Sequence, residues 1–537
     1  MFILDCTLRD GGYYNNWDFP DNIVTSYLKS AAEANIDYIE LGLRNFPQSG
    51  FLGAYAYTTE QHLNTLELPS GPTYGVMVDA KTILSASIGI ENALEKLFVP
   101  AEKSKVKLVR VAAHFNEVEH SAPIVKKLKE MGYLVGYNLM QAGGKPDHII
   151  AEKARLAREW DVLDVLYFAD SLGNMDSLEV ERIISALRTE WRGPIGIHTH
   201  NNMGKGLDNT ITAIDKGVTW VDSTITGMGR GAGNTQTEYL LAILDKNNKK
   251  YNPSPIYDLV IRHFETMQKE YGWGSNLLYF LGAQNDVHPT YIQNLLSNTH
   301  YETDEIVGAI KYLSDLEGAT SYNGSVLDSA LKFNSDLVPP SGTALIENKF
   351  LAQDVLLLAN GSTCERYKKS IELYIKLKKP IVISVNLNKH INESLIDYIV
   401  VSHNVKFLSE FHKYKKLNKT LILPKHRFSC SEMLEIEHLN IIDVGFNSSS
   451  TTYSIKNYVV NSPYDLTSAY VLGLLAMANP KSIKLVGFDG YGKGDHRQHE
   501  MLEILGEYKK LSPKCELTSL TPTEYPVNQG SIHAIHS

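Results

Sequence analysis

The first 245 residues repeat one pattern eight times, in which a short apolar run is followed by a longer amphipathic stretch. The runs are rich in Val, Ile, Leu or Tyr, which is typical of buried strands, and the stretches have helical periodicity. Eight strand–helix units in about 250 residues match a (β/α)8 barrel. A doubly wound sheet is the alternative, but it usually has fewer strands. The expected strands cover residues 2–6, 36–41, 74–78, 106–111, 134–139, 162–168, 195–199 and 220–225, with helices expected at 22–34, 121–131 and 148–160 among others.

The rest of the chain divides into two further parts. Residues 246–340 are expected to form a helical extension and a linker, which ends in the structure-breaking segment Pro339–Gly342. A new alternation of strands and helices then begins, so residues 341–537 predict a Rossmann-like α/β domain. Its strands are expected at 355–358, 380–385, 397–401, 420–423, 440–444 and 482–486.

The charge balance narrows the range of partners. The chain has 52 Lys and Arg against 61 Asp and Glu, a net charge of -9. Nucleic acids and anionic membranes favour basic surfaces, so neither is an expected partner. No segment approaches the ~18 apolar residues of a spanning helix, and no signal peptide fits before Arg9. We therefore expect a cytoplasmic protein without a membrane span, and we also expect a homo-oligomer.

Two histidines near the end of the seventh expected strand predict a metal site. His198 and His200 are two residues apart, so their side chains lie on the same face of a strand, and Thr199 lies on the other. Asp10 follows the first strand, which in a closed barrel is separated from the seventh only by the eighth. One carboxylate and two imidazoles suit a divalent cation that keeps open positions for water or substrate.

A glycine-rich segment, Gly227–Asn234, follows the eighth expected strand. Four glycines in seven residues allow a ligand to approach the backbone closely. In barrels of this type the loop after strand 8 often holds a phosphate or a carboxylate. A plain tight turn is the alternative interpretation.

Five motifs together resemble a known superfamily. They are Thr7–Gly12, Arg110–His114, Asp170–Gly173, His198–Asn202 and Gly227–Asn234. Their order and placement at strand ends resemble the DRE-type TIM-barrel metallolyases, which include 4-hydroxy-2-oxovalerate aldolases, 3-hydroxy-3-methylglutaryl-CoA lyases, and isopropylmalate and homocitrate synthases. The likeness covers residues 1–245, and more loosely extends to about 330. It is strongest to the 4-hydroxy-2-oxovalerate aldolase branch.

The resemblance implies roles for individual residues. Asp10, His198, His200 and Asn234 would hold a divalent ion, commonly Mn2+ or Mg2+, with Co2+ or Zn2+ as further candidates. Arg9 would stabilise the enolate oxygen that forms when a carbon–carbon bond breaks. The residues expected to lie near or contact the substrate, a small 2-oxo acid, are Glu40, Arg110, Asp170 and Ser171.

The expected reaction also needs a base, and here the sequence departs from the family. The aldolase branch has a histidine where this chain has Tyr13, and the lyase branch has a cysteine in its glycine loop that is absent here. A phenol is a weak base at neutral pH. Tyr13 is therefore either a substrate-binding phenol or an acid/base group. His114, a hydroxide on the metal, or a residue from 270–291 are the other candidates for the base.

The second domain contains one candidate anion site. Asn360, Gly361 and Ser362 form a polar turn between an expected strand and an expected helix, where backbone N–H groups would be available. The region 355–495 faintly resembles sialyltransferase-like and motility-associated glycosyltransferase domains. That resemblance implies a nucleotide or a nucleotide-sugar ligand, and a structural or docking role is the alternative.

Three functions remain open from the sequence. The first is a metal-dependent aldolase or lyase that cleaves or forms a carbon–carbon bond of a 4-hydroxy-2-oxo acid through a pyruvate enolate, in sugar-acid or surface-polysaccharide metabolism. The second is a Claisen-type synthase or lyase that uses an acyl-CoA. The third is a barrel without turnover that serves as a scaffold for a nucleotide-binding domain.

Overall fold

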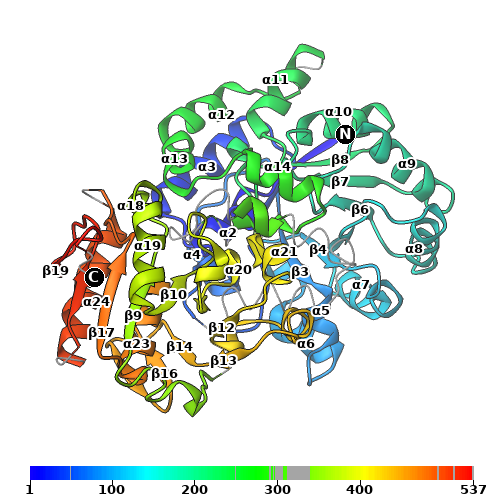
Figure 1. Ribbon diagram of the computed structural model, residues 1–537. Coiled ribbons are helices and arrows are strands. Elements are labelled where there is room, and N and C mark those ends of the chain that lie inside the picture. Colours follow the sequence, from blue (N-terminus) through cyan, green and yellow to red (C-terminus); the bar gives the residue numbers. More distant parts are fainter. Residues whose placement is uncertain are drawn as a thin grey trace. The chain divides into compact units, whose positions relative to one another are not determined.

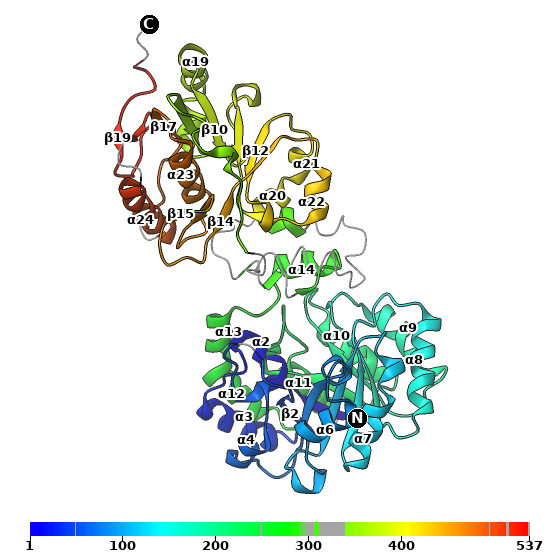
Figure 2. The same ribbon diagram turned by 90° about the horizontal axis from the view of Figure 1, so that it is seen from below.

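The computed structural model describes residues 1–48, 50–247, 250–289, 292–293, 296, 306–310, 339–492, 495–511 and 515–534, without the side chains of Asn247 and Ser431. These residues belong to two compact units, 1–297 and 298–537 (Figures 1 and 2). Much of the expected extension 246–340 lies outside the described residues, and the division of the chain at 245 and 340 stays a prediction. No helix in the described part is both long and apolar enough to cross a membrane.

The first unit contains a closed barrel of eight parallel strands in sequence order, as the alternation predicted. Each strand lies within two or three residues of its expected position. The largest shifts are at the second, fourth and sixth strands, which begin two or three residues late. The strands are β1 (Phe2–Asp5), β2 (Tyr38–Leu43), β3 (Thr73–Asp79), β4 (Leu108–Ala113), β5 (Leu134–Leu139), β6 (Val165–Asp170), β7 (Ile195–Thr199) and β8 (Trp220–Ser223).

Helices surround the barrel (Figure 1). Their apolar faces pack against the outward-facing strand residues in one continuous core. Two short helices, α1 and α2, follow β1 directly and carry residues of the candidate site. The helices are α1 (Thr7–Asp10), α2 (Gly12–Asn15), α3 (Asp21–Glu33), α4 (Glu60–Thr65), α5 (Ala80–Leu84), α6 (Ile90–Leu97), α7 (Ala122–Glu130), α8 (Asp147–Glu159), α9 (Ser177–Arg188), α10 (Gly206–Asp215) and α11 (Thr237–Asn247), followed by α12 (Ser254–Leu259), a π-helical turn (Val260–Phe264), α13 (Glu265–Tyr271) and α14 (Leu277–Gln284).

The interior of the barrel has an apolar layer and a charged layer. Tyr38, Tyr167 and Trp220 pack together in the apolar layer, with 4.3 Å between the ring centroids of Tyr38 and Trp220. Because strand residues alternate, the residues two positions further along β2 and β8 face the same interior. These residues are Glu40 and Asp222, both fully or nearly fully buried. The polar layer therefore lies nearer the carboxyl ends of the strands, where barrels of this type have their active sites.

The second unit is an α/β domain with a parallel eight-stranded sheet in the order β13-β12-β11-β10-β9-β17-β18-β19. All six expected strands are present. Helices α23 and α24 pack on one face, and α19, α20 and α21 pack on the other (Figure 2). The sequence did not predict β18, β19 or the small sheet β14-β16-β15. The strands are β9 (Asp354–Leu358), β10 (Ile381–Val385), β11 (Tyr398–Val400), β12 (Thr420–Leu423), β13 (Ile441–Asp443), β14 (Gly445–Asn447), β15 (Ser454–Lys456), β16 (Val459–Asn461), β17 (Ser482–Val486), β18 (Leu517–Ser519) and β19 (Asn528–Gln529), and the helices are α18 (Ser362–Arg366), α19 (Lys368–Lys378), α20 (Asn404–Ser409), α21 (Phe411–Tyr414), α22 (Cys430–Glu435), α23 (Thr467–Ala478) and α24 (His496–Leu511).

Candidate active site

The candidate site lies at the carboxyl ends of the barrel strands. Arg9 and Asp10 lie on α1, the single helical turn that follows β1, and both side chains are buried. His198 and His200 come from the end of β7, and both are buried on the same side of the strand. Thr199 points the other way, and its hydroxyl lies 2.7 Å from the hydroxyl of Thr235. The alternation expected from the sequence thus brings both imidazoles to one place.

Asp10, His198 and His200 form a cluster that can hold a metal ion. One potential ligand atom of each lies within 4.8 Å of the other two, and Nε2 of His198 is 3.6 Å from Oδ2 of Asp10. Asn234 lies beside the cluster and donates from Nδ2 to Oδ2 of Asp10 at 2.5 Å. Nδ1 of His200 and Oδ1 of Asn234 are buried and have no hydrogen-bond partner among the described residues. A carboxylate, two imidazoles and an amide oxygen suit a divalent cation.

The protonation states of this cluster favour cation binding. Burial lowers the pKa of His200 to about 3, so its imidazole is neutral at neutral pH. Burial would raise the pKa of Asp10, but the Arg9 guanidinium and the two histidines outweigh it and hold that pKa well below its usual value. The cluster therefore offers an anionic carboxylate and a neutral imidazole nitrogen, which are the forms that metals bind.

His198 is oriented by a buried carboxylate. Its Nδ1 lies 2.8 Å from Oδ2 of Asp222, which leaves Nε2 directed toward Asp10. A carboxylate behind a ligating histidine fixes the ring orientation and the tautomer. Burial alone would lower the pKa of His198. Its hydrogen bonds with Asp10 and Asp222 outweigh that effect, so the net pKa lies above the usual value. Asp222 was not predicted from the sequence, although its spacing two residues after Trp220 places it on the inward face.

A second group that could hold a metal shares His198 with the first. It consists of Cys6, His198 and Asp222, all buried. Its carboxylate oxygen is already bonded to both His198 and Arg110. Burial raises the pKa of the Cys6 thiol well above its usual value, so the thiolate that a metal needs is disfavoured. The cluster that contains Asp10 is therefore the better candidate for a metal site.

Arg110 and Glu40 were both expected to lie near or contact the substrate. In the structure their side chains form a buried ion pair with each other. Arg110 is fully buried and donates from Nε and Nη2 to the two oxygens of Glu40, at 2.8 and 2.6 Å. Its remaining Nη1 donates to Oδ2 of Asp222 at 2.6 Å. Glu40 also accepts from Nε of Arg9 at 2.8 Å. Glu40 therefore orients Arg9 directly, and Arg110 orients His198 through Asp222.

Arg9 has one donor left for a ligand. Its Nε and Nη1 are bonded to Glu40 and Asp10, the latter at 2.6 Å. Its Nη2 is buried and has no hydrogen-bond partner among the described residues. An unpaired guanidinium N–H beside the cluster is suited to an oxyanion, because a buried donor without a partner is costly.

Asp170 and Ser171 lie at the end of β6, as expected. Oδ1 of Asp170 accepts from the backbone N–H of Asn174 at 3.1 Å, while its Oδ2 is buried without a hydrogen-bond partner among the described residues. Burial raises the pKa of Asp170 to about 7. The Ser171 hydroxyl is bonded to the backbone N–H of Gln141 at 2.9 Å, so it retains only part of its bonding capacity for a ligand.

Tyr13 and His114 lie in a more open part of the site. The Tyr13 side chain is 39% exposed, and its ring packs against Trp17 with 4.8 Å between centroids. The guanidinium of Arg230, from the glycine-rich segment, lies 5.3 Å from the Tyr13 ring centroid. His114 follows β4, and burial lowers its pKa despite the nearby carboxylates of Glu117 and Asp79. The sequence had suggested the glycine-rich segment as a ligand loop but had assigned no role to Arg230.

The turn 360–362 of the second unit does not form the expected anion site. The Asp489 carboxylate accepts from the Ser362 hydroxyl at 2.9 Å and from the Thr363 backbone N–H at 2.8 Å. The Asn360 side chain bonds the backbone of Leu387 and Lys389 at 2.9 and 3.1 Å. A protein carboxylate therefore already accepts the backbone N–H of Thr363 and the hydroxyl of Ser362, where an anion was expected. Gly361 lies directly against this arrangement, since a Cβ there would be 2.3 Å from the Gly487 carbonyl oxygen.

Comparison with known proteins agrees with the geometry of the barrel. The HMGL-like family profile matches residues 1–259. The chain is 31% identical over 260 residues to a protein from Brevibacillus brevis named 4-hydroxy-2-oxovalerate aldolase, and that match covers 46% of this chain and 70% of the relative. The chain belongs to the HMGL-like family. A relative of the same name from Geobacillus thermodenitrificans is 33% identical over 249 residues, with the same coverage.

One solved structure extends the comparison. The N-terminal domain of a candidate aldolase from Bacteroides vulgatus is 32% identical, with a TM-score of 0.50. The match covers 56% of this chain and 98% of that domain. The HMGL-like relationship thus concerns the first unit, and these matches leave much of the second half of the chain uncovered.

The buried role of Arg110 is testable through stability. Arg110→Met removes the cation between two buried carboxylates, so we expect the free energy of unfolding of the barrel to fall by about 3–5 kcal/mol. All five tryptophans, at 17, 160, 191, 220 and 273, lie in the first unit, so their fluorescence in urea follows the barrel alone. Arg155→Met, which breaks a surface pair with Glu159, is the control and should cost less than about 1 kcal/mol. Equal effects of the two substitutions would contradict the assignment.

Proposed function

We propose that the barrel is a divalent-metal-dependent aldolase that acts on a 4-hydroxy-2-oxo acid and passes through a pyruvate enolate. The observation that carries the proposal is the unpaired Nη2 of Arg9 beside the cluster of Asp10, His198 and His200. Relatives named 4-hydroxy-2-oxovalerate aldolase, at 31–33% identity over the same residues, support this choice of substrate class.

The residues present fit a divalent cation. Asp10, His198 and His200 would hold it, with Oδ1 of Asn234 as a further oxygen donor if the amide turns away from its bond to Asp10. When bound, the ion would polarise the 2-oxo group of the substrate. Mn2+ and Mg2+ are the ions we propose first, because the resemblance to the DRE-type metallolyases implies them; the two imidazoles alone would equally suit Zn2+ or Co2+.

Arg9 is placed to stabilise the charge that develops. Cleavage breaks the bond between C3 and C4, and its electron pair moves toward C3 and the oxygen on C2. The free Nη2 of Arg9 can donate to that oxygen, and its other nitrogens are held by Glu40 and Asp10. A donor that is already oriented stabilises a transition-state oxyanion without reorganisation.

His114 is the base we propose for the 4-hydroxyl proton. Its lowered pKa keeps the imidazole neutral and able to accept a proton at neutral pH. When that proton leaves, the C4 oxygen becomes the carbonyl of the aldehyde product. Tyr13 would then bind substrate through its phenol, with its ring position stabilised by Trp17 and Arg230.

The proposal is tested by measuring pyruvate release from 4-hydroxy-2-oxovalerate with Mn2+ or Mg2+. The intact protein should release pyruvate, and a chelator should stop it. His200→Ala should abolish both Mn2+ binding in calorimetry and pyruvate release, because the cluster loses a ligand. His148→Ala, on the exposed surface of α8, should change neither.

Three results would contradict this function. Full pyruvate release by the His200→Ala variant would show that the assigned cluster is not the site. Tight Mn2+ binding without pyruvate release, but with turnover of an acyl-CoA, would instead indicate a Claisen-type enzyme. Metal binding without either turnover would favour the scaffold role.

The role of His114 predicts a pH dependence. A base must be deprotonated, so kcat/KM should fall as the pH drops through the pKa of His114, which lies below the ordinary histidine value of about 6.5. In His114→Gln this acid limb should disappear and the plateau should fall by about 10²–10⁴-fold. His120→Gln, an exposed neighbour, should retain the profile of the parent protein. An unchanged acid limb in His114→Gln would exclude His114 as the base.

A further inference from the structure

The second unit contains a cavity of about 660 Å³ at the carboxyl ends of its central strands. Its lining includes residues 359–361 after β9, residues 385–387 and 389 at the end of β10, and residues 487–491 after β17. In the sheet, β9 lies between β10 on one side and β17 on the other. The chain continues from β9 through β10 to β13 and later returns to β17 on the opposite side of β9, so the direction of strand order reverses there. Open parallel sheets bind ligands in the crevice at such a switch point. The volume is typical of sites for small molecules.

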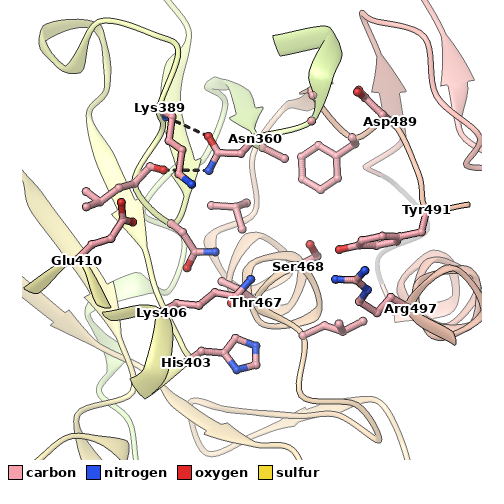
Figure 3. A pocket seen from close by; sticks show the side chains of 18 of the residues that line it. Asn360, Lys389, His403, Lys406, Glu410, Thr467, Ser468, Asp489, Tyr491 and Arg497 are labelled. Atoms are coloured by element: carbon pink, nitrogen blue, oxygen red, sulfur yellow. Dashed lines mark hydrogen bonds between the residues drawn. The ribbon is translucent and has the colours of Figure 1, made fainter. Parts of the chain in front are cut away.

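Cationic side chains from three different elements meet in this cavity. Lys389 follows β10, Lys406 lies on α20 and Arg497 lies on α24. Figure 3 shows Lys406 and Arg497 directed toward the same end of α23, where Ser468 lies. Arg497 also donates from Nη2 to Oδ2 of Asp495 at 2.8 Å, so its charge is partly compensated, whereas Lys389 forms no ion pair with the residues that the structure describes. Basic groups that converge from separate parts of the chain favour an anionic ligand.

The carboxylates in the lining are held by other partners. Glu410 pairs with Lys413 at 2.6 Å, and Asp465 pairs with Arg427 at 2.7 Å. Asp489 accepts from Ser362 and Thr363. Because each acid is engaged in this way, its charge is partly compensated, and it opposes an anion in the cavity less than a free carboxylate would.

The beginning of α23 adds to this environment. Leu466, Thr467 and Ser468 line the cavity, and no side chain caps this 12-residue helix. The first-turn N–H groups of a helix stabilise negative charge. Asn386 also lines the cavity, with a positive φ of 59° and an Oδ1 that is buried and lacks a hydrogen-bond partner among the described residues. A buried oxygen without a partner can accept a hydrogen bond from a hydroxyl or amino group of a ligand.

We propose that this cavity binds a phosphorylated small molecule of nucleotide size. Its phosphate lies among Lys406, Arg497 and the start of α23, and Asn386 accepts a hydrogen bond from its uncharged part. Phe488 and Tyr491 provide aromatic surface for that part. A nucleoside phosphate and a sugar phosphate share this chemistry. The proposal is independent of the reaction in the barrel, because all of these residues belong to the second unit.

Calorimetry on the full-length protein tests the site. The probes are UDP, CMP, GDP and ADP for nucleoside phosphates, glucose 1-phosphate for sugar phosphates, and inorganic phosphate. We expect at least one organic phosphate to bind with a Kd below ~1 mM and more tightly than inorganic phosphate. Lys406→Gln and Arg497→Gln should each weaken that binding by about tenfold or more, because each removes a charge-assisted contact. Lys376→Gln, an exposed lysine of α19, is the matched control and should bind as the parent does.

The probes also distinguish the two sources of the phosphate. Binding of nucleotides but not of glucose 1-phosphate supports a nucleotide site, and the converse supports a sugar-phosphate site. No binding by any organic probe at ~1 mM would overturn the proposal. So would equal binding by the parent, Lys406→Gln and Arg497→Gln proteins, and so would inorganic phosphate binding as tightly as every organic probe. Pyruvate release is measured separately, so failure here is distinguishable from failure of the aldolase assignment.

Discussion

The candidate site depends on a buried network of charges at the carboxyl end of the barrel. Two guanidinium groups, of Arg9 and Arg110, lie among the three carboxylates of Asp10, Glu40 and Asp222. With neutral histidines the network carries one excess negative charge, which a divalent cation would overcompensate and an anionic substrate would then balance. Charges in such a place are costly unless each has a partner, so loss of any one affects the others.

This network also orients side chains of the site through a chain of hydrogen bonds. Arg110 fixes Glu40 and Asp222, Glu40 fixes Arg9, and Asp222 fixes His198. Arg9 and His198 are thus each held by a neighbour in the barrel interior. Rigid support of this kind is what keeps catalytic groups in productive geometry. The apolar layer of Tyr38, Tyr167 and Trp220 underlies it.

Much of this could be predicted from the sequence, because it depends on local patterns. Alternation within a strand was enough to place His198 and His200 together, and the order of the strands was enough to bring Asp10 to them. The partners of Arg110 were not predictable, because they come from β2 and β8, which are far from β4 in the sequence. The motif that contains Arg110 indicated that this residue lies at the site. It did not indicate that the side chain binds the carboxylates of Glu40 and Asp222.

In the second unit, too, the contacts between segments that are distant in the sequence could not be predicted. The strands after residue 341 were predicted from their composition, but sheet order depends on long-range pairing and not on local pattern. The switch point at β9 and the cavity there therefore appeared only in the structure. The turn at Asn360 was a reasonable candidate for an anion, yet Asp489, 126 residues from Thr363, accepts the backbone N–H of Thr363. No local signal connects those two positions.

The position of a bound metal ion would distinguish the cluster that contains Asp10 from the one that contains Cys6. A crystal grown with Mn2+ and oxalate, a mimic of the pyruvate enolate, would locate the ion by its anomalous scattering. We expect one strong peak within about 2.0–2.3 Å of Asp10, His198 and His200, with oxalate beside Nη2 of Arg9. A peak between Cys6, His198 and Asp222, or the absence of a peak at the strand ends of the barrel, would contradict this expectation.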